Sequence, residues 1–287
     1  MGNVAAVNGY STWTSDDTAA CIAVPSEDDD KYRRGVLGVL TGSDRYPGAA
    51  VLGVEAALRT GVGMVRYAGP SRAGDLVLQR RPEAVTDVGR VQAWLIGSGT
   101  DASDRDDDVA RTISDALGQE VPVVLDGGAL DLHSEASGPV VITPHHRELA
   151  QLRGLDREAV EADPGRAAVE AADELGVTVL LKGHTTHVAG PGIRLAVSAA
   201  PTWLATAGAG DALGGILGAL VATHADEIAA DERMTARLAA AAAWLHGAAA
   251  ARASAGGPFT ILDLAAAVPA TIAALVSDRR RGDADAN

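Results

Sequence analysis

The sequence predicts an α/β fold, a three-layer sandwich in which helices cover both faces of a mostly parallel central sheet. Two observations lead to this fold class. Short apolar runs alternate with segments of helical periodicity, as in the runs 36–40 and 64–67 on either side of the helical segment 49–60. Most of these runs also end in a turn rich in glycine or charge, and the order strand, turn, helix, strand is the one found in parallel sheets.

The same pattern continues through most of the chain. Strands are predicted at 36–40, 64–67, 93–96, 121–125, 140–142 and 177–181, and a hairpin at 187–189 and 194–197. Helices are predicted at 49–60, 109–117, 167–175, 234–253 and 260–276, with a further helix entered from the turn 208–210. Because ligands bind at the carboxyl ends of strands in open parallel sheets, we expect the polar turns to meet in one cleft.

The chain divides into three predicted parts. Residues 1–34 are polar and are expected to be an irregular N-terminal segment. Residues 35–277 are expected to form a single catalytic domain, since no linker or repeat interrupts them. Residues 278–287 are expected to be a disordered tail.

Composition excludes several classes of partner. The 287 residues include 38 acidic and 24 basic side chains, so the net charge is −14 and the pI is near 4.8. Such a surface repels nucleic acid and anionic membranes, and neither is expected as a partner. With the single cysteine Cys21, no intrachain disulfide is possible. No apolar run of transmembrane length and no signal peptide are recognised, which predicts a cytoplasmic protein.

The turn Gly208-Ala209-Gly210-Asp211 leads directly into an apolar helix. The first amides of a helix have no partner inside it and lie at the positive end of its dipole, so this turn is suited to bind phosphate. A carboxylate beside such a site would repel phosphate unless it acts as a base, which gives Asp211 a catalytic role. The alternative is an ordinary N-cap, because aspartate and glycine are both common there.

Two further turns carry candidate ligand-binding residues. Lys182-Gly183-His184-Thr185-Thr186 combines a charge, an open amide and hydroxyls suited to a nucleotide phosphate, although a surface lysine before a turn has the same pattern. In the turn 143–148, Glu148 is a candidate to hold Mg²⁺ through water and His145 a candidate substrate contact. The alternative there is a helix start with Thr143 as the N-cap and Pro144 at the first helical position.

Other candidates are less specific. Asp126 ends a strand and is either substrate-facing or a turn residue. His145 and His146 are not expected to bind zinc, because no cysteine or third histidine lies at ligand spacing. His246 lies in the alanine-rich segment and is expected to be a packed core histidine.

The order of these motifs resembles the ADP/ATP-dependent NAD(P)H-hydrate dehydratase family of the ribokinase-like superfamily. The resemblance runs from about residue 35 to 249. It is carried by Gly42-Ser43, 46–50, Arg59-Thr60-Gly61-Val62-Gly63, Leu125-Asp126 with Ala129-Leu130, Thr143-Pro144-His145 with Glu148, Lys182-Gly183 with Thr186, 208–211, and His246-Gly247. The Thr-Pro-His element with its glutamate distinguishes this branch from sugar kinases.

The resemblance implies a fold and a set of ligand contacts. The fold is the ribokinase-like sandwich, with ADP or ATP as phosphoryl donor and Mg²⁺ as cofactor. Residues 182–186 and Gly210 would contact the nucleotide. The hydrated NADH or NADPH substrate would contact the residues Ala49 or Ala50, Gly97 or Gly99, Asp126, His145 and Asp211. Three turns depart from the family pattern, namely His146-Arg147, Gly127-Gly128 and Gly97-Ser98-Gly99.

The implied reaction is ADP-dependent dehydration of the hydrated nicotinamide ring. Asp211 would take the proton of the ring hydroxyl while residues 208–210 hold the transferred phosphoryl group. Two alternatives stay open: a kinase of a hydroxymethylpyrimidine, a thiazole or a sugar, and a nucleotide-binding module without activity. The epimerase domain that often accompanies this family has no room before residue 35, which predicts cooperation with a separate epimerase. The alanine-rich segment 234–253 is a candidate contact with a second copy, giving a homo-oligomer.

Overall fold

The computed structural model describes residues 9–87, 89–105 and 107–285. Its β-strands are β1 (Ser11–Thr12), β2 (Val36–Leu40), β3 (Met64–Tyr67), β4 (Ala93–Ile96), β5 (Val123–Leu125), β6 (Val140–Ile142), β7 (Thr178–Leu181), β8 (Thr186–Gly190) and β9 (Ile193–Val197). Its α-helices are α1 (Ser15–Ala20), α2 (Gly48–Thr60), α3 (Ser71–Arg80), α4 (Asp107–Leu117), α5 (His146–Arg153), α6 (Arg157–Ala162), α7 (Pro164–Leu175), α8 (Ala209–Thr223), α9 (Ala225–Ala230), α10 (Met234–Ser254) and α11 (Ile261–Asp285).

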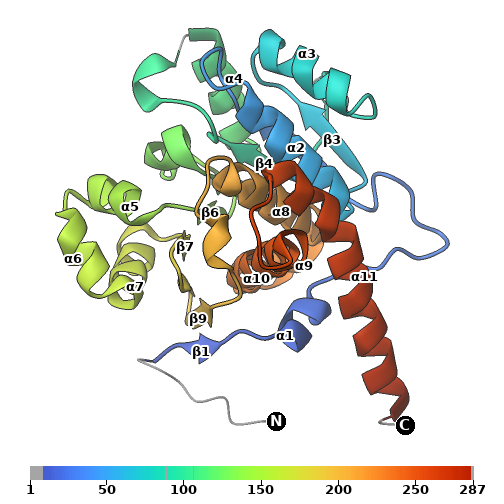
Figure 1. Ribbon diagram of the computed structural model, residues 1–287. Coiled ribbons are helices and arrows are strands. Elements are labelled where there is room, and N and C mark those ends of the chain that lie inside the picture. The colour runs from blue at the N-terminus through green and yellow to red at the C-terminus, as the bar shows by residue number, and fades with distance from the viewer. Residues whose placement is uncertain (1–8, 88, 106, 286–287) are drawn as a thin grey trace.

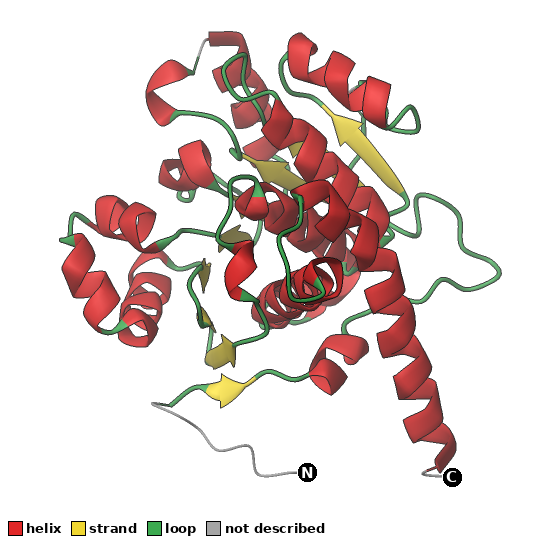
Figure 2. Ribbon diagram, viewed as in Figure 1, coloured by secondary structure: helices red, strands yellow, loops and turns green. Residues whose placement is uncertain are grey.

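Within the described residues the strands form one sheet in the order β1-β9-β8-β7-β6-β5-β4-β2-β3. All neighbours are parallel except at the hairpin, where β8 is antiparallel to both β7 and β9. Figure 2 shows the sheet running through the middle of the molecule with helices around it. The predicted mostly parallel sheet and the predicted hairpin are therefore confirmed.

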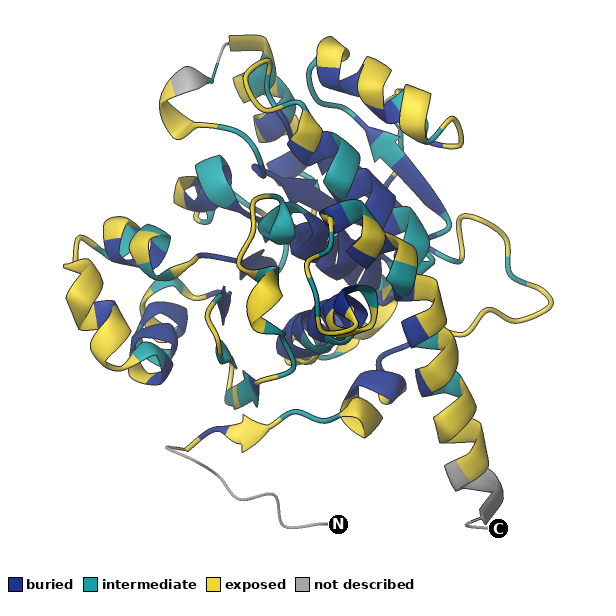
Figure 3. Cartoon of the chain, viewed as in Figure 1, coloured by how far each residue is buried: buried dark blue, intermediate teal, exposed yellow. Residues whose placement is uncertain are grey.

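Helices cover both faces of the sheet, so the predicted three-layer sandwich is confirmed (Figure 1). One hydrophobic core lies between the sheet and α2, α8, α10 and α11, and a second lies between the sheet and α4, α5 and α7. Side chains of successive strand residues enter opposite cores, as Val36 and Leu37 do, because strand side chains alternate between faces. This is why the central strands β2, β4, β5 and β6 consist of apolar residues and glycine and are fully buried, as the dark blue strands in the middle of Figure 3 show.

Residues 1–8 of the N-terminal segment 1–34 lie outside the described residues. The described part, residues 9–34, differs from the irregular structure expected of the segment. It contains β1, which pairs in parallel with β9, and the short helix α1. A capping box between Thr14 and Asp17 begins α1, and Trp13 donates its main-chain N–H to Ala196 at 2.9 Å. Tertiary contact with the hairpin therefore orders a polar stretch whose own sequence carries little periodicity.

The C-terminal end also differs from the expected disordered tail. Helix α11 continues to Asp285, and Figure 1 shows its end projecting beyond the rest of the domain. Arg279 on this projecting part donates from Nη1 to the Ala19 carbonyl at 3.3 Å, which ties the helix to α1. The sequence analysis recognised no apolar run of membrane-spanning length, whereas α11 between Ile261 and Arg281 meets that test by length and composition. Part of it is buried against α10 and α2, as in core helices of many proteins.

Candidate functional site

The carboxyl ends of β2, β4, β5, β6 and β7 all lie at one edge of the sheet, because these strands are parallel. The turns that follow them carry the residues predicted from the sequence, and α8 begins at the same edge. Gly208 enters α8 in the left-handed conformation with φ of 87°. A Cβ on Gly208 would lie 2.6 Å from Leu52 Cδ1, so glycine is required both for the backbone and for the space.

The first turn of α8 has no side-chain cap; the Ala209 N–H makes a long hydrogen bond of 3.4 Å to the Thr206 carbonyl. The amides of Gly210 and Asp211 follow it at the positive end of the helix dipole. Asp211 lies in this turn, and Lys182 approaches it from the end of β7: a Cβ placed on Gly210 would be 3.6 Å from Lys182 Nζ. A helix N-terminus and an ammonium group thus meet at one place, which suits the binding of a phosphoryl group.

Lys182 is held by acidic groups. Its Nζ donates to Asp126 Oδ1 at 2.8 Å and lies 3.7 Å from Glu148 Oε2. Burial alone would lower the pKa of Lys182, but the charges of Asp126 and Glu148 outweigh it and raise the pKa above its ordinary value. The side chain is 21% exposed. Lys182 therefore remains a fixed cation beside the start of α8.

Asp126 is 5% exposed and fully hydrogen-bonded. Thr143 donates to Oδ1 at 2.8 Å and Ser98 donates to Oδ2 at 2.9 Å, in addition to Lys182. Burial opposes ionisation, but the Lys182 charge and these hydrogen bonds hold the pKa of Asp126 below its usual value. Asp126 was expected to face the substrate or to be a turn residue, and contact with the substrate stays a prediction. In the structure Asp126 is the buried counter-ion of Lys182.

The pKa of Asp211 is shifted in the opposite direction to that of Asp126. Burial, and after it the negative charge of Asp126, raise the pKa of Asp211 to about 6, although Lys182 opposes the rise. An acid with a pKa near the working pH is suited to accept a proton from a hydroxyl group. The ordinary N-cap interpretation of this turn holds for the glycine and not for the aspartate, because Gly208 is the N-cap residue and Asp211 caps no amide.

The turn after β6 begins a helix two residues later than the sequence suggested. His145, not Thr143, is the N-cap of α5, and Glu148 completes a capping box with it. His145 Nδ1 accepts from the Glu148 N–H at 3.0 Å, and Glu148 Oε2 accepts from the His145 N–H at 2.7 Å. The Nδ1 contact leaves the Nε2 of this half-exposed imidazole for a ligand. Thr143 is not a cap because its hydroxyl is used on Asp126.

The predicted substrate-binding turns divide into exposed and buried members. Gly99 approaches Ala49 so closely that a Cβ on it would lie 2.3 Å from Ala49 Cβ. Ala50 and Gly97 are buried, and a Cβ on Gly97 would lie 2.1 Å from the Asp126 carbonyl. Ala50 and Gly97 therefore shape the site by close packing, while Gly99 is the member open to a ligand.

The remaining nucleotide-loop residues form the turn between β7 and β8. Gly183 and His184 are exposed there, and Thr185 pairs with Ser198 through their hydroxyls at 2.9 Å. Thr186 begins β8. The lysine of this loop points away from the turn toward Asp126, so only residues 183–186 form the exposed part of the predicted nucleotide loop.

Sequence reasoning missed one supporting residue, Ser98, which was noted only as the middle of a glycine turn although its position after a strand was the available signal. His246 was expected to be a packed histidine, and its exposure of 6% confirms this. Burial lowers the pKa of His246 to about 4, although the Ala209 main chain opposes the shift, so a neutral imidazole lies near the first residue of α8.

Comparisons with known proteins show the family of the chain. Residues 37–267 match the family model described as NAD(P)H-hydrate dehydratase. The bifunctional NAD(P)H-hydrate repair enzyme Nnr of Mycobacterium tuberculosis is 43% identical over 224 residues, covering 72% of this chain and 45% of that protein. The chain thus spans about half the length of the curated relatives of this kind that it matches.

Solved structures share the fold. The Bacillus subtilis ADP/ATP-dependent NAD(P)H-hydrate dehydratase, co-crystallised with ATP and Mg²⁺, superposes with a TM-score of 0.82 and 25% identity over 92% of this chain and 98% of that one. A ribokinase-like superfamily protein from Enterococcus faecalis, 23% identical, covers 96% of this chain and 99% of its own with a TM-score of 0.80. The fold is therefore ribokinase-like, and the chain belongs to the NAD(P)H-hydrate dehydratase family.

Proposed function

We propose that the protein dehydrates hydrated NADH or NADPH with ADP as the phosphoryl donor, and so repairs a damaged nicotinamide nucleotide. The observation that supports this most directly is that Asp211 and Lys182 lie near each other at the start of α8. An acid with a pKa of about 6 lies near a cation and the N-terminal amides of a helix that has no side-chain cap. This combination serves a reaction in which a hydroxyl loses its proton while it attacks a phosphoryl group.

The reaction proceeds in two stages. Asp211 accepts the proton of the ring hydroxyl while the hydroxyl oxygen attacks the terminal phosphorus of the donor. The donor's bridging oxygen leaves with the electrons of the broken bond. The amides of Ala209 and Gly210, with Lys182, hold the negative charge on the transferred group. The phosphate then departs with the carbon–oxygen electron pair, and loss of a proton from the neighbouring ring carbon forms the double bond of the reduced nicotinamide. Phosphorylation is needed because water is a much poorer leaving group than phosphate.

The ligands are assigned by position. The donor nucleotide is proposed to contact residues 183–186 and Gly210, and the nicotinamide end is proposed to contact Ala49, Gly99 and His145. Asp126 is given a supporting role, because Lys182 and two hydroxyls occupy its oxygens. The name of the B. subtilis relative includes both ADP and ATP, and we propose ADP for this chain.

Magnesium fits one place in this site. Among the described residues no cluster of three or more histidine, cysteine or acidic side chains could hold a metal directly. Mg²⁺ keeps most of its waters and takes few carboxylates, so Glu148, which is 25% exposed and beside Lys182, is a suitable residue to hold it through water. When bound, the ion would neutralise charge on the donor phosphates.

The partner and the compartment also follow as proposals. Because the M. tuberculosis relative is named as bifunctional, we propose that this dehydratase cooperates with an epimerase of the hydrated nucleotides. We propose a cytoplasmic location, with neither nucleic acid nor membrane as a partner, and contact with a second copy through α10.

The reaction is tested by recovery of reduced-nicotinamide absorbance from hydrated NADH with Mg²⁺ and either ADP or ATP. Recovery with ADP supports both the reaction and the donor, and recovery with ATP alone corrects the donor. If a stable phosphorylated product accumulates instead, the chain is a kinase of the same fold. Nucleotide binding without turnover of any hydroxylated compound would make it a binding module.

Asp211→Asn is the decisive variant for the mechanism. We expect a loss of kcat by roughly three orders of magnitude or more, since the amide cannot accept the proton, with an unchanged Kd for ADP. Rates of absorbance recovery and calorimetric ADP binding measure the two quantities. Activity close to that of the wild type would remove Asp211 from the role of base.

A further inference from the structure

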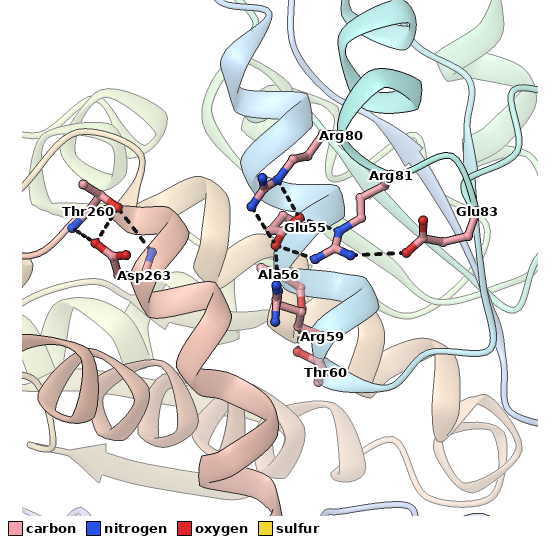
Figure 4. A network of polar contacts seen from close by, with 9 residues as sticks. All are labelled: Glu55, Ala56, Arg59, Thr60, Arg80, Arg81, Glu83, Thr260 and Asp263. Atoms are coloured by element: carbon pink, nitrogen blue, oxygen red, sulfur yellow. Dashed lines mark hydrogen bonds and ion pairs between the residues drawn. The ribbon is translucent and has the colours of Figure 1, made fainter.

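Three arginine side chains converge on one carboxylate between α2 and α3 (Figure 4). Glu55 on α2 has no exposed surface, and it accepts hydrogen bonds from Arg59, Arg80 and Arg81. Burial would raise the pKa of Glu55, but the hydrogen bonds and charges of the arginines outweigh it and lower the pKa to about 2. The cluster is therefore one fixed anion surrounded by three cations.

The positive charge of this cluster is in excess. Arg81 binds both oxygens of Glu55 and also lies 3.4 Å from Glu83. Arg80 has the longest contacts, with its Nε 3.2 Å from Oε2 and its Nη2 3.4 Å from Oε1, and it is the most exposed of the three at 45%. Arg80 is therefore the guanidinium best able to bind an outside anion while Arg81 keeps Glu55 paired.

Arg80 lines a surface groove of about 480 Å³, named here the α2–α3 groove. The groove is lined by Gly48, Val51, Leu52, Leu76, Gln79 and Arg80. Its floor is mostly aliphatic, and Leu76 is one of the few large apolar side chains left exposed in the described residues, at 36%. A groove of this kind fits a ligand with a flat apolar part and a negative charge.

The α2–α3 groove borders the candidate active site. Gly48 is followed in α2 by Ala49, whose Cβ touches the position a side chain on Gly99 would take. Leu52 packs against Gly208, the entry to the phosphate-binding turn. From Gly48 to Glu55 the helix rises by about 10 Å, which is close to the length of a nucleoside diphosphate.

We propose that the α2–α3 groove binds the adenosine-diphosphate half of the dinucleotide substrate, with Arg80 contacting its phosphates and the aliphatic floor contacting its base. The proposal rests on the proposed function, which places the nicotinamide half at Asp211 and Ala49. A dinucleotide anchored there must extend its second half along the surface, and the groove is the adjoining surface with excess positive charge.

Binding of the product NADH tests the proposal without any need for turnover. Calorimetry gives the Kd of NADH and of reduced nicotinamide mononucleotide, which lacks the second half, with the donor site saturated by ADP. We expect the wild type to bind NADH about tenfold or more tightly than the mononucleotide, and Arg80→Gln to reduce this ratio to about twofold, since one charge-assisted contact is lost. The Kd of the mononucleotide should not change.

Two further variants separate the groove from the Glu55 cluster. Arg59→Gln also removes a partner of Glu55 but does not line the groove, so its NADH preference should equal that of the wild type. Leu76→Glu leaves the cluster intact and places a negative charge in the groove, so it should lower the preference as Arg80→Gln does. Thermal unfolding of all variants identifies any that fail to fold.

The outcomes distinguish this inference from the function. Equal binding of NADH and the mononucleotide by the wild type would overturn the groove assignment, as would an Arg80→Gln variant that keeps the full preference. If the groove variants behave as expected but hydrated NADH is not dehydrated, the proposed reaction is wrong while the dinucleotide groove stands.

Discussion

Asp211 illustrates how a reactive group is prepared by its surroundings at the residue scale. Asp126 is buried nearby with its own charge neutralised by Lys182 and two hydroxyl donors. Asp211 has no such set of donors, and its pKa rises to about 6. The pKa values of two acids in one site are thus shifted in opposite directions, which keeps Asp126 as a permanent anion and suits Asp211 to its proposed role as the base.

The pH dependence of the reaction should report this base. Because Asp211 acts when ionised, kcat/KM should fall on the acid side with an apparent pKa of about 6. Initial rates across the acid range measure it, with a melting curve at each pH as the control for unfolding. An acid limb near the ordinary aspartate pKa of 3.8 would show that another group limits the reaction.

The same carboxylate should reduce the stability of the fold. Its pKa is about 6 in the folded state against 3.8 ordinarily, so the folded protein binds the proton more tightly and loses stability as pH rises through this interval. Asp211→Asn should therefore raise the free energy of unfolding at neutral pH by about 2 kcal/mol. The gain should vanish below about pH 4.

Denaturant unfolding of the wild type and Asp211→Asn at both pH values measures this difference. Asp44→Asn is the matched control, because Asp44 is exposed, and its free energy of unfolding should change little. A neutral-pH loss of stability in Asp211→Asn would contradict the account of the raised pKa.

At the element scale, the closest contact in the core is between α2 and α8, the helices that carry Ala49 and Asp211. A Cβ on Gly215 would lie 2.1 Å from the Gly53 carbonyl oxygen and 3.1 Å from Ala56 Cβ. Glycine thus lets the two helix backbones touch. The adjacent glycines Gly214 and Gly215 of α8 both have a structural explanation, since a Cβ on Gly214 would lie 3.2 Å from Leu95 Cδ1 of the sheet.

Gly215→Ala should separate these helices. Although alanine favours helix by about 1 kcal/mol over glycine, the clash with backbone outweighs this gain, and we expect a net loss of about 1–3 kcal/mol. Melting temperature and kcat should fall together, because α8 carries the base. Gly48→Ala, where a Cβ has nothing within 4 Å, is the control for stability. A Gly215→Ala variant more stable than the wild type would contradict the packing argument.

At the scale of the whole molecule, the sequence predicts the sheet well because its strands are buried on both faces. The runs 36–40, 64–67, 93–96 and 140–142 coincide with β2, β3, β4 and β6. What it does not predict depends on contacts between distant segments. Helices α1 and α5 begin at capping boxes in polar stretches, and β1 exists only because β9 lies beside it.

The candidate site also has one part that the sequence predicts and another part that it does not predict. The sequence predicts that the polar turns meet at one edge of the sheet, since the carboxyl ends of parallel strands lie at the same edge. The pairing of Lys182 with Asp126 links positions 56 apart, and the support of Ala209 by His246 links two helices. Neither has a local sequence signal. The α2–α3 groove is likewise a property of packed surfaces and not of a motif.

Membrane binding by α11 is also a question at the scale of the whole molecule. Helix α11 is long and apolar enough to span a bilayer, but 39% of its apolar window is buried within the domain and the net charge is −14. We expect the protein to stay unbound in a flotation assay with anionic vesicles, because the buried face is already satisfied and the charges repel. Co-flotation with the vesicles would contradict this, and co-flotation of a chain ending at residue 260 would assign the binding elsewhere.

The pairing of β1 with β9 has a consequence for any chain that lacks the N-terminal segment. Among the described residues, Ser11 and Thr12 with the adjoining Trp13 amide cover the outer side of β9. A chain shortened to start at residue 35 would keep every proposed site residue and the pairing of β9 with β8, yet the outer edge of β9 would lose these partners. An uncovered strand edge is a template for other chains. We therefore expect the shortened chain to self-associate more readily than the full chain, an effect unrelated to catalysis.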